Sequence, residues 1–188
     1  MLKNPRCLYE SSIDYFIGID RDTIFGKLCE GYHGGTLTTT REAWLEEIEI
    51  LQKELLPWKN ADGHIIFEYD IPRLGKRIDV VLLLHGIIFC LEFKVGESKI
   101  IENNIDQVLD YALDLRHFHK FSESKVIVPM LVATKYQKHT SIIQQSAYND
   151  RVLNPIVTGE NGIQELIAKV IDMYPNESDV DSRWIISP

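Results

Sequence analysis

Two apolar runs of five residues each, only two residues apart, constrain the fold of this 188-residue chain more than any other feature. They lie within Ile78–Leu84 and Ile87–Val95, and His85 and Gly86 separate them. Short runs that flank a two-residue turn containing glycine predict a β-hairpin. Strands that are apolar on both sides have both faces covered. We therefore expect these two strands at the centre of a sheet, with other elements packed on each face.

A long amphipathic helix is predicted before the hairpin, over Thr39–Leu56. Thr39 and Glu42 have the spacing of a capping box, and Pro57 ends the pattern. The apolar stripe recurs at helical spacing and consists of Trp44, Ile48, Leu51 and Leu55. Glu47 lies at the edge of this stripe, so its carboxylate is expected to lean toward the core.

The other elements complete an α/β pattern. Further strands are expected over Ile65–Ile71, Lys125–Ala133 and Asn154–Val157, and helices over Glu102–His119 and Gly162–Met173. Short helices are expected over Ser12–Ile17, Asp22–Cys29 and Ser141–Tyr148, with a loop over Gly31–Thr40. The order predicts a sandwich with a mixed central sheet flanked by helices. We expect an N-terminal extension over residues 1–40, a core over 41–175 and a C-terminal tail over 176–188.

Composition and charge exclude several classes of protein. No apolar run reaches the roughly 20 residues that a membrane span needs, and the N-terminus lacks the apolar core of a signal peptide, so we expect a cytoplasmic protein without a membrane partner. Three widely spaced cysteines predict neither disulfides nor a zinc site. The net charge of −8 argues against strong autonomous binding of a polyanion. A local basic cluster of Arg73, Lys76 and Arg77 is nevertheless suited to contact a phosphate backbone.

Two acids and a lysine are expected to converge on the hairpin. Glu92 and Lys94 alternate onto one face of their strand, and Asp79 on the neighbouring strand can face the same side. Two carboxylates at about 4 Å repel by roughly 4 kcal/mol at an effective dielectric of 20. A Mg²⁺ or Mn²⁺ ion held by hard oxygen ligands is the commonest reason for such an arrangement. The alternative is a structural ion pair in which Lys94 bridges the two acids.

The same residues resemble a known family. The ordered set of Glu47, Gly75–Asp79, Leu91–Lys94 and Gln107–Tyr111 is similar to the motifs of the PD-(D/E)XK nuclease superfamily, and its Gln-x-x-x-Tyr element to the RecB-like branch. The chain departs from the pattern at Ile78, where the family name has proline.

The resemblance implies a restriction-endonuclease-like three-layer sandwich and phosphodiester hydrolysis. It implies that Asp79, Glu92 and the carbonyl of Phe93 bind Mg²⁺ or Mn²⁺. In this interpretation Lys94 is the catalytic lysine, while Glu47 and Gln107 are an additional acid and a supporting polar group. Tyr111 joins Arg73, Lys76 and Arg77 as a candidate contact with nucleic acid, DNA more than RNA.

More specifically, the stretches Phe67–Val81 and Leu91–Gly96 resemble a nuclease-like domain that precedes a Schlafen-related helicase domain in bacterial proteins. The tail over 176–188 is then a linker to a helicase, which is the expected partner. The chain has no Gly-x₄-Gly-Lys-Ser/Thr phosphate loop of its own. Three hypotheses follow: a metal-dependent nuclease, a catalytically silent nucleic-acid-binding or scaffolding module of the same fold, and a metal-independent enzyme.

Overall fold

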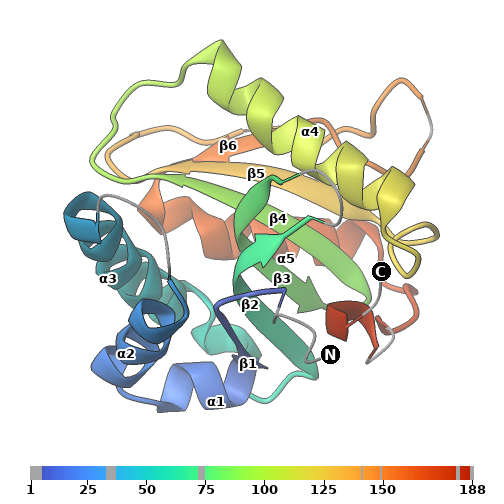
Figure 1. The fold of residues 1–188 in the computed structure, drawn as a ribbon. Coiled ribbons are helices and arrows are strands. Elements are labelled where there is room, and N and C mark those ends of the chain that lie inside the picture. Colours follow the sequence, from blue (N-terminus) through green and yellow to red (C-terminus); the bar gives the residue numbers. More distant parts are fainter. Residues whose placement is uncertain are drawn as a thin grey trace.

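A six-stranded mixed sheet forms the centre of the protein (Figure 1). The computed structural model describes residues 6–32, 37–71, 75–140, 142–148, 150–180 and 183–186. The strands follow one another in sequence order: β1 (Tyr9–Ser12), β2 (Gly63–Asp70), β3 (Arg77–Leu84), β4 (Ile87–Lys94), β5 (Ile127–Ala133) and β6 (Ile156–Thr158). The pairs β1–β2, β2–β3 and β3–β4 are antiparallel, and the pairs β4–β5 and β5–β6 are parallel. The prediction of a mixed central sheet is therefore confirmed.

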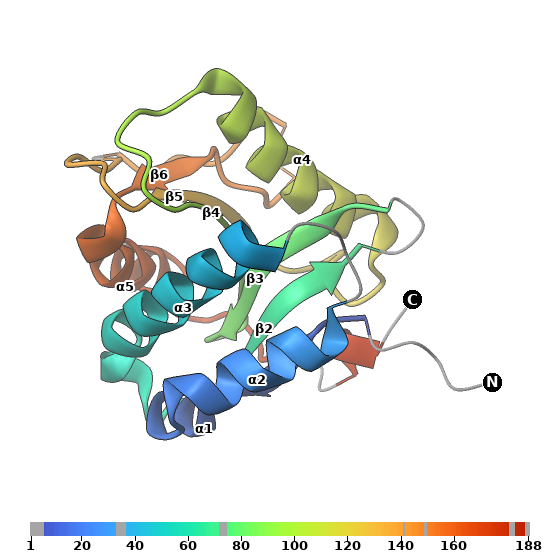
Figure 2. The same ribbon diagram turned by 60° about the vertical axis from the view of Figure 1, so that its left-hand side comes forward.

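Helices cover both faces of the sheet, as two views show (Figures 1 and 2). One face carries α1 (Ile13–Gly18), α2 (Arg21–Gly31), α3 (Leu37–Glu54) and α5 (Ile163–Met173). The other face carries α4 (Glu102–Phe118). Three short 3₁₀ turns complete the described elements: η1 (Leu56–Trp58), η2 (Glu160–Gly162) and η3 (Trp184–Ile186). The arrangement is a three-layer α/β sandwich.

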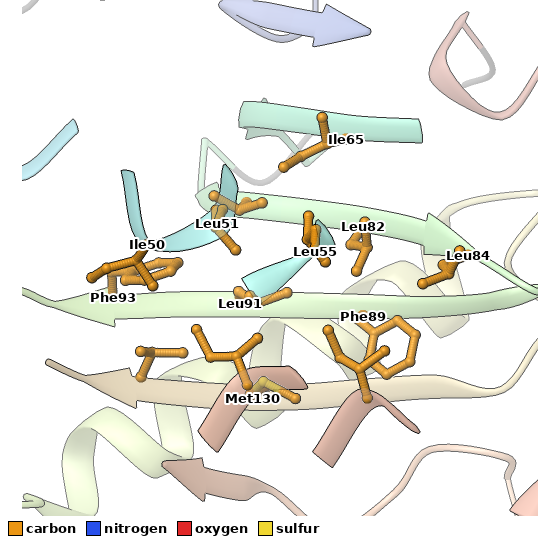
Figure 3. Close-up of a cluster of buried hydrophobic side chains, with 14 of the residues drawn as sticks. Ile50, Leu51, Leu55, Ile65, Leu82, Leu84, Phe89, Leu91, Phe93 and Met130 are labelled. Atoms are coloured by element: carbon orange, nitrogen blue, oxygen red, sulfur yellow. The ribbon is translucent and has the colours of Figure 1, made fainter. Parts of the chain in front are cut away.

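The β3–β4 hairpin lies in the middle of the sheet. His85 and Gly86 have φ angles of 50° and 75°, and two successive positive φ angles are those of the tight turn that suits a hairpin. Beyond the turn, both strands are buried almost throughout, so the predicted burial on both faces is confirmed. Figure 3 shows Leu51 of α3 and Leu55, which directly follows this helix, among the apolar side chains of the sheet.

Two local predictions are wrong. The backbone is helical from Leu37, so Thr39 lies inside α3 and is not the N-cap of a capping box. Residues 142–148 form no helix, because their backbone pairs with the nearby residues 152–154 instead. Ser146 N–H donates to the carbonyl of Val152, and the carbonyl of Gln144 accepts from Asn154 N–H. A helix would need those same groups for its own ladder.

Both ends of the described chain take part in the fold. β1 pairs with β2, with Tyr9 opposite Phe67, although no strand was predicted there. Trp184 is completely buried, and its ring centroid lies 4.3 Å from that of His119. The predicted strand begins at Ile127 and not at Lys125. The side chain of Lys125 donates from Nζ to the carbonyl groups of Ser178 and Asp179. The segments expected before and after the core therefore supply a strand and a core side chain.

Candidate functional site

The candidate site lies where β3 and β4 separate. Their paired register runs from Leu84 opposite Ile87 to Val80 opposite Leu91. Beyond this point the Asp79 carboxylate takes the place of a backbone acceptor, because its Oδ2 accepts the Phe93 N–H at 2.9 Å. At this point a hydrogen bond to the Asp79 side chain replaces a backbone hydrogen bond between the two strands. This bond holds Asp79 beside Glu92.

Four of the predicted residues form one hydrogen-bonded network. Lys94 Nζ donates to Glu92 Oε1 at 2.6 Å and to Gln107 Oε1 at 3.4 Å. Gln107 Nε2 donates to Glu92 Oε1 at 2.9 Å and to the hydroxyl of Tyr111 at 2.7 Å. Alternation along β4 and the one-turn spacing on α4 bring these groups together. The structure therefore unites the Glu-x-Lys element with the Gln-x-x-x-Tyr element.

Glu47 reaches the same acidic region from the opposite layer. It lies on α3, is only 4% exposed, and its Oε2 has no hydrogen-bond partner among the described residues. Burial, together with the smaller effects of the charges of Glu68 and Glu92, raises the pKa of Glu47 to about 8. A carboxyl group this isolated is protonated near neutral pH unless a cation accompanies it.

The two hairpin acids are perturbed in the same direction. Burial raises the pKa of Asp79 well above its ordinary value, the charges of Glu92 and Glu47 add to this, and the Phe93 N–H opposes it. Burial also raises the pKa of Glu92, although the bond from Lys94 offsets part of the effect. A single lysine therefore does not compensate the negative charge gathered here. Perturbed carboxyl groups of this kind are typical of functional sites.

The donor chemistry of the site fits a hard divalent cation. Glu47 Oε2 and Glu92 Oε2 are buried carboxylate oxygens without a hydrogen-bond partner in the described part of the chain. Within the same residues, no three or more His, Cys, Asp or Glu side chains are arranged to hold a metal ion. Mg²⁺ requires fewer protein ligands than that, since it usually keeps several waters and uses one or two carboxylates. Asp79 and Glu92 supply such a pair.

The Phe93 carbonyl points to the β3 side of β4. In an extended strand the N–H and C=O of one residue point to the same side. The Phe93 N–H is directed at Asp79, so its C=O points to the same side, beyond the last pair of the β3–β4 ladder. The carbonyl therefore lies on the same side of β4 as the bond between the Phe93 N–H and Asp79.

Three of the predicted nucleic-acid contacts, Lys76, Arg77 and Tyr111, are described by the structure, and each interacts with other residues of the protein. Lys76 Nζ lies 3.1 Å from Asp114 Oδ2 and 3.6 Å from Asp110 Oδ2. Arg77 pairs with Glu68 and Asp70. Tyr111 is 7% exposed, and Arg73 lies outside the described residues. A surface pocket of about 270 Å³ opens beside this part of α4 and is lined by Lys76, Asn103, Asp106, Gln107, Asp110 and Tyr111.

Glu68 is the site residue that sequence reasoning missed. It lies on β2, its charge raises the pKa values of Glu47, Asp79 and Glu92, and its carboxylate binds Trp44 and Arg77. The signal available in the sequence was an acid that interrupts the apolar run Ile65–Phe67. That signal alone does not distinguish a site acid from a solvent-facing one.

Comparison of the chain with protein-family models gives no match, and comparison with the sequences of curated proteins gives none either. Among the described residues, no helix has both the length and the apolar character that crossing a membrane requires. The case for a function therefore depends on the site itself.

Proposed function

We propose that this protein is a metal-dependent nuclease that hydrolyses phosphodiester bonds, with DNA as its substrate. One observation carries the proposal: Asp79, Glu92, Lys94 and Gln107 meet at the end of the β3–β4 ladder, where buried carboxylate oxygens have no partner in the described residues. The three-layer α/β architecture is compatible with the restriction-endonuclease-like fold that the sequence resemblance implies.

The hairpin acids are the proposed ligands. Asp79 and Glu92, with the Phe93 carbonyl, would hold a Mg²⁺ or Mn²⁺ ion. A divalent cation bound there would polarise a phosphoryl oxygen and lower the pKa of a coordinated water toward neutrality. Lys94 compensates only one of the two buried carboxylates, and an uncompensated buried charge is unfavourable, which supports this assignment.

Lys94 and Gln107 would organise the reacting groups. The Lys94 side chain is 25% exposed while that of Glu92 is 4% exposed, so Lys94 is the more accessible of the two to solvent. Nζ would donate to the attacking water or to a phosphoryl oxygen that gains negative charge. Gln107 bonds to both side chains and would keep them in register. Glu47 would add a further negative charge from α3.

The pocket along α4 offers a route for the substrate. Lys76 lines it beside Gln107, and the neighbouring Arg77 lies on β3. Both cations now face carboxylates, so a phosphate backbone would have to replace Asp114 at Lys76 or Asp70 at Arg77. Binding of nucleic acid should therefore weaken strongly as the salt concentration rises, because electrostatic contacts with phosphates depend on salt in this way.

Cleavage assays test the proposal directly. Labelled single- and double-stranded DNA and RNA are incubated with Mg²⁺ or Mn²⁺ and with wild type, Lys94→Ala or Lys59→Ala. Lys59 is an exposed lysine next to η1 and serves as the matched control. We expect cleavage of DNA by wild type and Lys59→Ala, and a loss of about 10²-fold or more in Lys94→Ala. Equal activity in all three proteins would contradict the assignment.

A silent nucleic-acid-binding or scaffolding module is the second candidate. It is favoured by one observation: Lys94, Lys76 and Arg77 are all paired with acids already, which is the pattern of a structural charge network. Such a module would position a partner, with a helicase as the first choice. A protein that shows no cleavage with either metal and no change of melting temperature with Mn²⁺ would support this candidate over the nuclease.

A further inference from the structure

Glu68 has a backbone conformation that a glutamate in the middle of a strand does not normally adopt. Its φ angle is 55°, in the left-handed region, although it lies within β2 and is not glycine. This region is disfavoured for residues with a Cβ atom, and such residues persist only where the surroundings hold them. Strained positions of this kind cluster at functional sites.

The strain coincides with an irregularity shared by two strands. Phe67 pairs with Val80 and Tyr69 with Ile78, so Glu68 lies opposite Asp79. In a regular strand, residues three apart face opposite sides. Here Ile66 and Tyr69 both belong to the core cluster on the α4 side, as do Ile78 and Val81. The alternation therefore reverses at Glu68 in β2 and at Asp79 in β3.

The Glu68 carboxylate joins the two layers that carry the candidate acids. Its Oε1 accepts the Trp44 Nε1–H of α3 at 2.8 Å, and its Oε2 accepts from Arg77 Nη1 of β3 at 3.2 Å. The side chain is 13% exposed, so water competes little for these bonds. Trp44 itself is buried, and the bond to Glu68 satisfies its single polar group.

Both partners of Glu68 lie close to site acids along the chain. Trp44 precedes Glu47 by three residues, about one turn of α3, so the two side chains share a face of that helix. Arg77 precedes Asp79 by two residues on β3. A displacement of Trp44 or Arg77 would therefore carry a site acid with it.

We propose that Glu68 is a positioning residue that fixes the α3 acid Glu47 against the hairpin acids by bonding to Trp44 and Arg77. This inference rests on the proposed nuclease function, because it assigns Glu68 to the geometry of the same metal site. Glu68 does not bind the metal or the substrate in this scheme; it acts through Trp44 and Arg77. The left-handed backbone is the consequence of directing its carboxylate between two layers.

The first measurement tests the bond itself without metal. Hydrogen exchange of the Trp44 indole N–H, assigned by its loss in Trp44→Phe, is slow in wild type and becomes at least tenfold faster in Glu68→Ala. Glu68→Gln retains an oxygen that accepts from Trp44 and restores part of the protection. Unchanged exchange in Glu68→Ala would overturn the proposal.

The second measurement tests positioning, by calorimetric titration with Mn²⁺. We expect Glu68→Ala to weaken Mn²⁺ binding by about tenfold or more, as loss of a group that orients ligands does elsewhere. Glu68→Gly accommodates the left-handed backbone without strain, yet should weaken binding equally. Leu28→Ala removes a buried side chain of α2, lowers the melting temperature, and should leave Mn²⁺ affinity unchanged.

The outcomes separate the two proposals. Wild type that neither binds Mn²⁺ nor cleaves nucleic acid overturns the nuclease and this inference with it. If Glu68→Ala and Glu68→Gly bind Mn²⁺ as tightly as wild type does, the positioning role of Glu68 is overturned and the nuclease proposal is not. Equal weakening in Leu28→Ala also overturns it, because the effect would then follow stability and not position.

Discussion

The two ends of the β3–β4 hairpin differ sharply although the same two strands form both. At the turn, regular pairing continues to Leu84 opposite Ile87, and both side chains are buried apolar groups. At the other end, pairing stops at Val80 opposite Leu91, and carboxylates occupy the next positions. The apolar turn end stabilises the fold. The other end retains buried charges that folding does not require, which is typical of a functional site.

If the turn end serves only stability, a cavity there should lower the free energy of unfolding more than any other change considered, and it should leave Mn²⁺ affinity unchanged. Leu84→Ala removes a side chain that is 1% exposed and should lower the free energy of unfolding by about 2–5 kcal/mol. Denaturation in urea measures the change. Phe118→Ala, at a position that is 53% exposed, is the control and should change stability little. A folded Leu84→Ala protein with weakened Mn²⁺ affinity would show that the two ends are not separable.

Metal binding should stabilise the protein through the acidic end alone. Mn²⁺ at 100 times its dissociation constant should raise the free energy of unfolding by about 2.7 kcal/mol. Asp79→Asn should lose most of this gain, since it removes a proposed ligand. Asp172→Asn, an exposed position on α5, is the matched control and should keep it. Thermal unfolding at several Mn²⁺ concentrations distinguishes the variants, and a gain retained in Asp79→Asn would exclude Asp79 as a ligand.

The pH dependence of stability should report the buried charge of Glu47. Its folded pKa of about 8 lies above the ordinary value of 4.5, so the folded state binds the proton more tightly than the unfolded state does. The contribution of Glu47 to stability is then complete below pH 4.5 and is lost as the pH rises through 8. Glu47→Gln should remove this loss and raise the free energy of unfolding at pH 8 by about 1–3 kcal/mol.

The control for Glu47 is a matched change at the surface of the same helix. Glu49→Gln alters an exposed acid whose partner is Arg21, and should leave the pH dependence as in wild type. Mn²⁺ should flatten the slope of wild type, because the cation takes over the role of the proton. Urea unfolding between pH 5 and 9 provides the data. An unchanged slope in Glu47→Gln would assign the titration to another group.

The sequence predicted those parts of this comparison that depend on local pattern. Apolar runs around His85 and Gly86 indicate a hairpin, and the spacings of Glu92, Lys94 and Gln107 follow from strand alternation and helix geometry. The left-handed Glu68 was not predictable, because its conformation depends on Trp44, which is remote in sequence. The burial of Trp184 was missed for the same reason, since His119 is its neighbour only in the fold.

The turn itself should show the smallest of these effects. Gly86 has a φ angle of 75°, and an added Cβ atom would lie 2.3 Å from the carbonyl oxygen of Ser178. Gly86→Ala should therefore lower the free energy of unfolding by about 1–2 kcal/mol from backbone strain, and more if the 177–178 segment cannot shift. Gly18→Ala is the matched control, since its added Cβ would meet no atom within 4 Å apart from its chain neighbours and the backbone of its own helix. Equal stability of both variants would mean that the turn is not the rigid end of the hairpin, and the contrast with the acidic end would lose its basis.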